Sequence, residues 1–152
     1  MRSYSPDDAD PPRDDLHWLA VRLFQDLGRR ELPVVAAHGL SLWGFEVLGR
    51  LIRRPADSQA ELGAALGLDK SKIVRVLDEL ERHGHARRTS GPDDRRRRVL
   101  TATDHGRAAW ESARDRLDEI ERELFLCLPA RERDVVRRGL KRLVDALDQP
   151  TT

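Results

Sequence analysis

The basic side chains of the chain gather in its middle, most densely at residues 95–98. This run of four arginines directly follows Asp93 and Asp94. Four adjacent like charges repel one another and have no evident structural use, whereas the negative potential of a DNA minor groove favours inserted arginine. The alternative interpretation is a basic, solvated loop. We favour DNA binding, and the candidate residues are Arg87, Arg88, Asp94, Arg95, Arg96, Arg97 and Arg98.

These residues have different expected tasks. Arg87 and Arg88 can neutralise phosphates, and one arginine of the run should pair with Asp94 and brace the loop. A second group, at residues 70–75, suits base edges: arginine can contact guanine through two hydrogen bonds, valine can touch a thymine methyl group, and lysine or serine can reach bases or phosphates. Its candidate residues are Lys70, Ser71, Lys72, Val74 and Arg75. Taken alone, this group is explained equally well as a solvated helix face.

The elements around these residues predict a helix-turn-helix. Ser58 and Glu61 form a capping box that begins a short helix, with Leu62, Ala65 and Leu66 expected on its buried side and Gly67 at its end. Asp69 is a good N-cap for the next helix, which should end at Gly84. The apolar stripe of this second helix is Ile73, Val76, Leu77 and Leu80. The residues at 70–75 then occupy the N-terminal end of a recognition helix, on the face opposite the stripe.

A β-hairpin is predicted directly after this helix. Residues 86–89 and 97–103 suit extended strands, and the segment between them, 90–94, has strong turn chemistry. Arg98, Leu100 and Ala102 should share one face of the second strand. A hairpin in this position is a wing, and it carries the arginine run.

Helical patterns flank the winged segment on both sides. One begins at Asp15 and carries Leu16, Leu19, Leu23, Phe24 and Leu27, with Pro33 and Gly39 expected to interrupt the helix after these residues. Ser41 should cap a helix that runs to Arg54. Thr103 or Asp104 should cap a long helix that ends at Pro129, and a last helix carries Val136, Leu140, Leu143 and Leu147. The predicted fold is mainly α with a small β wing, a winged helix-turn-helix flanked by N- and C-terminal dimerisation helices.

The expected domain organisation follows from these patterns. Residues 1–14 form a polar, disordered tail, 15–40 an N-terminal dimerisation helix and loop, 41–106 the DNA-binding domain, and 107–148 the C-terminal dimerisation helices. The net charge of the 152 residues is only +1. However, residues 53–107 contain 13 basic and 9 acidic residues, so the positive field lies over the winged segment.

At residues 41–106 the chain resembles the MarR family of bacterial transcription regulators. The matching stretches are LGLDKS at 66–71, VLDELE at 76–81, HG at 83–84, PDDRR at 92–96, and Thr103-x-x-Gly106. The resemblance implies a winged helix-turn-helix dimer, and the flanking helices extend it over nearly the whole chain after residue 14. Val74, Val99 and Ala102 depart from residues common in the family, which suggests a shifted base preference and a looser wing strand.

The apolar stripes of the first helix and the last two helices predict a homodimer. The central segment has too little apolar surface to cover them, and such helices bury their faces against a partner. Two recognition helices then meet successive major grooves of double-stranded DNA, which predicts a pseudo-palindromic operator. The alternative is a monomer whose terminal helices fold back on the winged segment.

The resemblance also implies a small phenolic or carboxylate effector that releases the DNA. His17, Trp18, Arg22, His38 and Trp43 are candidate ligand-binding residues near a cleft between the dimer helices and the winged segment. The alternative is that both tryptophans are core or dimer contacts. Cys127, the single cysteine, is expected to be a buried small hydrophobe and not an oxidant sensor. The histidines show no i,i+4 pair, and a helix cap is the simpler role for His83 and His85.

Other function classes find little support in the residues. No glycine-rich phosphate loop, metal-ligand cluster or nucleophile beside a base is apparent, so no catalytic residue, metal or cofactor is expected. The N-terminus has no apolar signal core, and no run approaches membrane-spanning length, which predicts a cytoplasmic protein without a membrane partner. The prediction is a DNA-binding transcriptional repressor. The alternatives are a winged-helix protein–protein interaction module and a DNA-binding protein that responds to no ligand.

Overall fold

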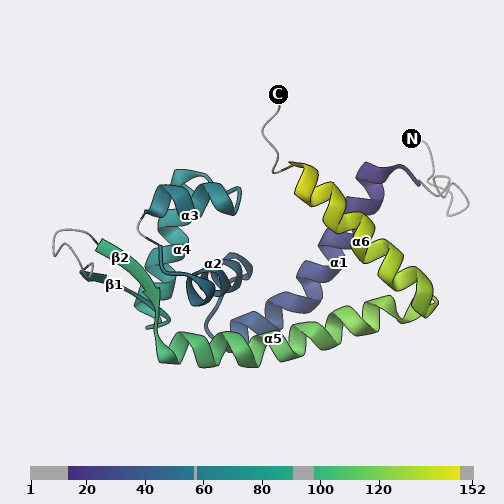
Figure 1. Ribbon diagram of the computed structural model, residues 1–152. Coiled ribbons are helices and arrows are strands. Elements are labelled where there is room, and N and C mark those ends of the chain that lie inside the picture. The colour runs from purple at the N-terminus through teal and green to yellow at the C-terminus, as the bar shows by residue number, and fades with distance from the viewer. Residues whose placement is uncertain (1–13, 57, 91–97, 148–152) are drawn as a thin grey trace, which may run out of the picture. The chain divides into compact units, whose positions relative to one another are not determined.

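The computed structural model describes residues 14–56, 58–90 and 98–147. The described chain forms two compact units, which divide after Ala113 within a long helix. The predicted fold class, mainly helical with a small antiparallel sheet, is confirmed (Figure 1). The elements are α1 (Leu16–Ala37), α2 (Leu42–Arg53), α3 (Gln59–Ala65), α4 (Lys70–Arg82), β1 (Ala86–Ser90), β2 (Arg98–Ala102), α5 (Asp104–Leu124), a 3₁₀ turn (Phe125–Cys127) and α6 (Ala130–Leu147).

Side-chain caps begin the helices at the positions that the sequence predicts. Ser41, Ser58 and Asp69 are the N-caps of α2, α3 and α4. Each accepts a hydrogen bond from the backbone N–H three residues later, at 2.9, 3.3 and 2.8 Å respectively. Of the two candidate caps for α5, Thr103 is the one used, and its Oγ1 accepts from the N–H of Gly106 at 2.9 Å. Such caps satisfy donors at a helix end that have no partner within the helix.

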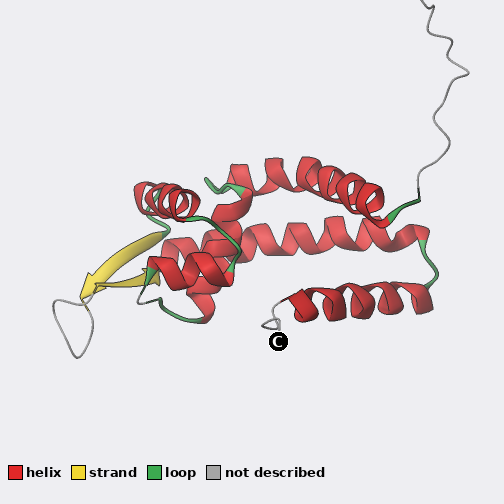
Figure 2. Cartoon of the chain, turned by 90° about the horizontal axis from the view of Figure 1, so that it is seen from above, coloured by secondary structure: helices red, strands yellow, loops and turns green. Residues whose placement is uncertain are grey.

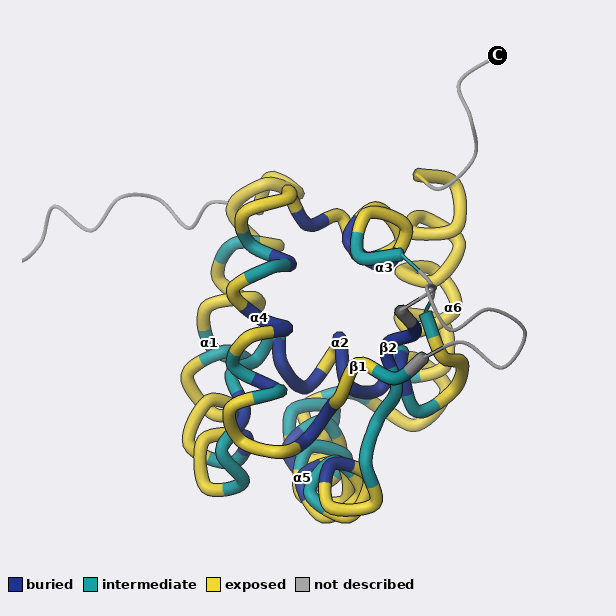
Figure 3. Tube along the Cα trace, turned by 90° about the vertical axis from the view of Figure 1, so that its left-hand side faces the viewer, coloured by how far each residue is buried: buried dark blue, intermediate teal, exposed yellow. Residues whose placement is uncertain are grey.

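The core of the first unit lies where α2 and α4 bring their apolar stripes together (Figure 3). The predicted stripe of α4 is buried in full, and Leu48 and Leu51 of α2 are buried against it. Burial of each such aliphatic side chain contributes about 1.5–3 kcal/mol relative to its exposed state. This core therefore determines which side of α4 remains available at the surface.

The expected interruption of the first helix at Pro33 is wrong. α1 continues through Pro33 to Ala37, and Gly39, with φ of 69°, follows the helix end. Proline removes only one backbone donor, so the helix loses one i to i−4 hydrogen bond at this point. Val35 is fully buried and accepts backbone N–H groups from His38 and Leu40, so the last turn is held in place by tertiary packing.

The buried side of α3 also differs from the prediction. Leu62 and Gly63 are buried, whereas Ala65 is exposed and Leu66 only partly covered. A Cβ atom at Gly63 would lie 3.1 Å from the carbonyl oxygen of Leu68 and 3.3 Å from Cγ2 of Ile73. Gly63 therefore lies on the side of α3 that contacts α4. The apolar pattern could not predict this, because glycine contributes no apolar side chain. The turn that follows uses Gly67 at φ of 64°.

The wing is an antiparallel pair in which Ala86 lies opposite Ala102 and Ser90 opposite Arg98. Its strands extend away from the helices (Figure 2). Leu100 also exchanges two backbone hydrogen bonds with Ala56, at 2.7 and 3.0 Å, so β2 is held on both edges at its base. Most of the predicted turn, from residue 91 onward, lies outside the described residues.

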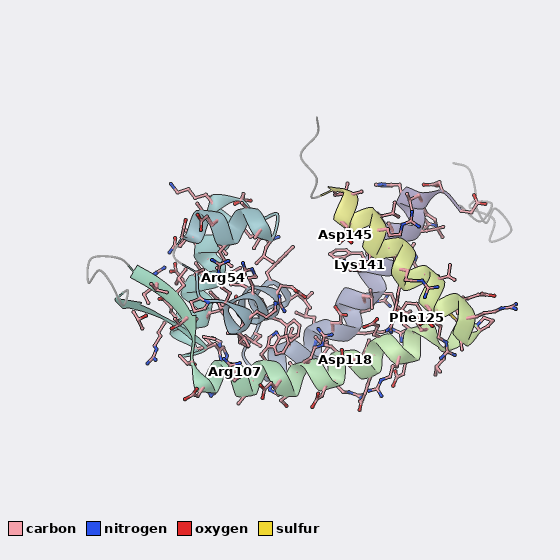
Figure 4. All side chains as sticks on the ribbon, viewed as in Figure 1. Arg54, Arg107, Asp118, Phe125, Lys141 and Asp145 are labelled. Atoms are coloured by element: carbon pink, nitrogen blue, oxygen red, sulfur yellow. The ribbon has the colours of Figure 1, made fainter. Side chains whose placement is uncertain are left out.

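The second unit contains the end of α5, the 3₁₀ turn and α6, which is exposed along its length (Figure 3). Arg137 pairs with Glu121 at 2.8 Å and lies 4.8 Å from the ring centre of Phe125, which ties α6 to the preceding helix. On α6 itself, Lys141 pairs with Asp145 (Figure 4). The expectation that Cys127 is buried is wrong: the residue is exposed, because the 3₁₀ turn leaves it on the outside.

Within the described residues, no single helix is long and apolar enough to cross a membrane. Only α1 and α2 taken together, bent by 67° at the break between them, reach that length and composition.

Candidate nucleic-acid interface

The N-terminal end of α4 presents three of the predicted DNA-contacting residues to solvent. Lys70, Ser71 and Arg75 are exposed, and Ser71 and Arg75 lie opposite the buried stripe. The partial positive charge at a helix N-terminus adds to the attraction for phosphate groups. This end of the helix therefore combines a positive field with donors that suit base edges.

Lys72 and Val74 do not share this face, contrary to the prediction. Both are only half exposed, because a helix turns about 100° per residue and these two positions flank the buried side. The ammonium group of Lys72 lies 4.4 Å from the ring centre of Trp43, at the start of α2. Trp43 is one of the candidate ligand-binding residues, with a core or dimer contact as the alternative, and the structure places it against the recognition helix.

The start of α2 is also joined to α4 through Glu79. The backbone N–H of Ser41 donates to Oε1 of Glu79 at 2.8 Å. A Cβ atom at Gly44 would lie 2.9 Å from the same carboxylate oxygen, so the glycine permits this close approach. Glu79 was not among the predicted site residues. In the sequence, what links Glu79 to the site is its spacing: it lies two helical turns after Lys72, on the same edge of α4.

The two arginines of β1 have different surroundings. Arg87 is exposed. Arg88 pairs with Glu81 of α4 at 2.8 Å and approaches Asp78 at 4.0 Å. These carboxylates already balance the charge of Arg88, so its position favours a link between wing and recognition helix over a free phosphate contact.

Of the remaining predicted wing residues, only Arg98 lies within the described part of the chain. Asp94, Arg95, Arg96 and Arg97 lie outside the described residues. The backbone of Arg98 belongs to β2, opposite Ser90. A further basic pair that the prediction omitted, Arg53 and Arg54, is exposed at the end of α2, and Arg54 is labelled in Figure 4. Arg54 lines a cavity of about 110 Å³ beside the base of the wing. The sequence feature that could have revealed this basic pair is the two adjacent arginines directly before Pro55.

A histidine cluster lies behind the recognition helix, where α4, β1 and α5 meet. His83 is the C-cap of α4, whereas His85 is 2% exposed and stacks on the ring of His105 with centroids 4.9 Å apart. Burial lowers the pKa of His85, and the charges of His105 and His83 lower it further. Neither ring nitrogen has a partner of good hydrogen-bond geometry among the described residues, although the backbone of His38 and Gly39 offsets the shift in part.

The histidine cluster has no metal-binding geometry in the described part of the chain. There, no three His, Cys, Asp or Glu side chains are placed so that they could hold a metal ion. Burial lowers the pKa of His85 and so favours its neutral form, and the stacked rings show that it is packed as part of the core.

The five candidate ligand-binding residues do not form one site within the chain. His17, Trp18 and Arg22 are exposed on the first turns of α1, with the Arg22 guanidinium 5.9 Å from the ring centre of Trp18. His38 and Trp43 follow the other end of the same helix. Twenty helical residues span about 30 Å. The five residues expected to line one cleft therefore form two groups, one at each end of α1.

Comparison with known proteins supports the assignment of these elements. The sequence model of the MarR family matches residues 38–97. YcgE of Bacillus subtilis, an HTH-type transcriptional regulator, is 32% identical over 146 residues, which cover 86% of this chain and 95% of YcgE.

Two solved structures show the same fold. CouR from Rhodococcus jostii RHA1, bound to p-coumaroyl-CoA, superposes with a TM-score of 0.76 at 28% identity, over 91% of this chain and 95% of CouR. The transcriptional repressor CouR bound to a 23-mer DNA duplex gives a TM-score of 0.74 at 31% identity, over 86% and 93%. Since sequence and fold agree over most of its length, this chain belongs to the MarR family of winged helix-turn-helix transcriptional regulators.

Proposed function

We propose that the protein is a homodimeric transcriptional repressor that binds a pseudo-palindromic DNA duplex through α4 and the wing. The observation that carries this proposal is the exposed N-terminal end of α4, where Ser71 and Arg75 lie opposite a fully buried apolar stripe and Lys70 is exposed on the first turn. The DNA complex of CouR, a repressor of the same fold, supports it. A role on DNA also implies a cytoplasmic location, and no catalytic activity is part of the proposal.

The dimer is supported by apolar side chains that the chain leaves exposed. Most of them lie on α1 and α6, where a partner chain with the same surface could cover them. They are Leu16, Trp18, Leu19, Leu23, Phe24 and Leu32 of α1, Leu126 of the 3₁₀ turn, and Val135, Val136, Leu140, Leu143, Val144 and Leu147 of α6. A two-fold dimer presents two α4 helices to successive major grooves, about 34–36 Å apart along the duplex.

In this proposal the wing supplies contacts outside the major groove. Arg95, Arg96, Arg97 and Arg98 approach the minor groove and backbone, braced through Asp94. Arg87 contacts a phosphate, and Arg88 fixes the hairpin to α4 through Glu81.

A small phenolic or carboxylate effector that releases the DNA is the second part of the proposal. Its support is CouR, whose crystal structure contains p-coumaroyl-CoA. Within this chain the cluster of His17, Trp18 and Arg22 offers an aromatic face and a cation close together. A shift in the thermal unfolding temperature with phenolic acids and their thioesters, lost on Arg22→Ala, is the expected result. No shift with any such compound would contradict this part.

DNA binding is tested by fluorescence anisotropy with duplexes selected from a random pool. Arg75→Ala should weaken binding to the selected site by about 1–3 kcal/mol and relax the preference at one base position, because a bidentate contact is lost. Arg96→Ala should weaken binding to all sequences. Arg29→Ala is the control, since Arg29 is exposed on α1 in a pair with Asp26. Unchanged binding by both variants would exclude this surface.

The two arginines of β1 allow a finer test. Removal of a phosphate contact reduces the slope of log K against log salt by about 1. Arg87→Ala should produce this reduction. Arg88→Ala should leave the slope nearly unchanged, because Glu81 already balances the charge. Equal changes in slope for both variants would show that Arg88 also contacts DNA.

A further inference from the structure

Trp43 and Lys72 form a contact between the start of α2 and the recognition helix. The lysine ammonium lies 4.4 Å from the centre of the indole ring. A cation within about 6 Å of the face of an aromatic ring is attracted by the negative charge of that face, and tryptophan is the strongest partner. Both residues are half-buried, so the contact is partly shielded from water.

The backbone around Trp43 lies close to Glu79 of α4. The N–H of Ser41 donates to Oε1 of Glu79 at 2.8 Å. Gly44 lies so close to that oxygen that a Cβ atom there would be 2.9 Å from it. Because Ser41 is bonded to Glu79 and Gly44 packs closely against the same carboxylate, the segment of α2 that carries the indole ring is fixed beside α4.

We infer that Trp43 is a positioning residue for DNA binding, which holds the Lys72 ammonium where it contacts a phosphate group. This inference rests on the proposed function. A free lysine loses much rotamer freedom when it binds, because its four-carbon stem is flexible. Trp43 orders that stem before DNA arrives. The ring occupies one side of the ammonium group, and N–H donors remain for phosphate oxygens on the other.

The position of Lys72 on α4 favours phosphate over base edges. Lys72 flanks the buried side of the helix, whereas Ser71 and Arg75 occupy the fully exposed face. A residue on the flank of a recognition helix faces the wall of the major groove, which the sugar–phosphate backbone forms. Trp43 therefore affects the affinity for DNA and leaves the preferred sequence unchanged.

A double-mutant cycle tests this coupling on one selected duplex at several salt concentrations. Trp43→Leu removes the ring face but no charge, so we expect affinity to fall about two- to fivefold with the salt slope unchanged. Lys72→Met removes the charge, so affinity should fall and the slope decrease by about 1. The double variant should bind no more weakly than Lys72→Met alone.

Two further variants separate positioning from general packing. Trp43→Phe keeps an aromatic face and should recover most of the affinity. Lys141→Met removes an exposed lysine of α6 and should leave both affinity and slope unchanged. If Trp43→Leu does not fold, the cycle is run with Trp43→Phe, whose smaller loss should again require Lys72. Thermal unfolding of each variant identifies losses that come from the fold.

Several outcomes would overturn the inference. Additive losses in the cycle would show that Trp43 acts independently of Lys72. Tighter binding by Trp43→Leu would show that the ring withholds Lys72 from DNA, and a changed sequence preference would place Lys72 at a base. Failure of the proposed function would look different: the unmodified protein would select no DNA sequence from the random pool, and Arg75→Ala would leave DNA binding unchanged.

Discussion

At the scale of single residues, His85 combines burial with a titratable ring. It is 2% exposed and lies between the rings of His83 and His105, so a positive charge there is unfavourable. The groups that face it are those two histidines and the backbone of His38 and Gly39, and no acidic side chain is among the causes of its pKa shift. The neutral ring therefore belongs to the folded state.

This arrangement predicts a pH dependence of stability. The pKa of His85 in the folded protein is below the ordinary value of 6.5. The contribution of its neutral ring to the free energy of unfolding is therefore fully present above about pH 6.5. As the pH falls from there towards the folded pKa, the unfolded chain takes up a proton that the folded chain does not, and the free energy of unfolding decreases. Urea unfolding between pH 5 and 8 measures the slope.

Two variants test whether His85 causes this dependence of the free energy of unfolding on pH. His85→Gln should flatten it in the acidic range, whereas His17→Gln, at an exposed position of α1, should retain it. An equally steep slope in His85→Gln would assign the effect to other groups.

At the scale of elements, the start of α5 is fixed to the turn between α4 and β1. Thr103 Oγ1 donates to the carbonyl oxygen of Gly84 at 2.6 Å and also caps α5 through Gly106. A Cβ atom at Gly106 would lie 2.1 Å from the carbonyl oxygen of His85, which is backbone and cannot rotate away. Recognition helix, wing and long helix therefore meet at one rigid junction.

Gly106→Ala should consequently destabilise the protein by about 3 kcal/mol, because the backbone at His85 must move and the Thr103 bonds are strained. The matched control is Gly139→Ala in α6, where a Cβ atom meets nothing within 4 Å and alanine favours the helix. Chemical denaturation compares the two. A Gly106→Ala protein as stable as the control would show that the junction is not rigid.

At the scale of the whole molecule, the exposed apolar residues of α6 predict that dimerisation and DNA affinity are linked. Leu143 is 57% exposed in the chain, so Leu143→Asp should leave the winged unit folded and disrupt the dimer. Loss of the second recognition helix should lower affinity for a two-half-site duplex about 100-fold or more. Light scattering and anisotropy measure the two effects.

A matched substitution places the same charge elsewhere on α6. Arg138→Asp changes a polar exposed position and should leave the dimer intact. A Leu143→Asp protein that remains dimeric, or a monomer that binds DNA as tightly as the parent, would contradict the proposed assembly.

The helix-turn-helix, its caps and the wing strands were determined by the sequence itself, because these features depend on neighbours within a few residues. Ser41, Ser58 and Asp69 bond to backbone three residues away, and the α4 stripe repeats within the helix. The exposed face with Ser71 and Arg75 follows from the same periodicity.

Only the tertiary structure decided which charged and aromatic side chains are engaged by partners distant in sequence. Arg88 pairs with Glu81, Trp43 lies beneath Lys72, and His85 is buried against His105. Tertiary packing also determines that α1 continues past Pro33 to Ala37 and that Cys127 is exposed. The physical reason is common to all of them: these energies depend on contacts between separate elements, and local periodicity contains no information on how the elements meet.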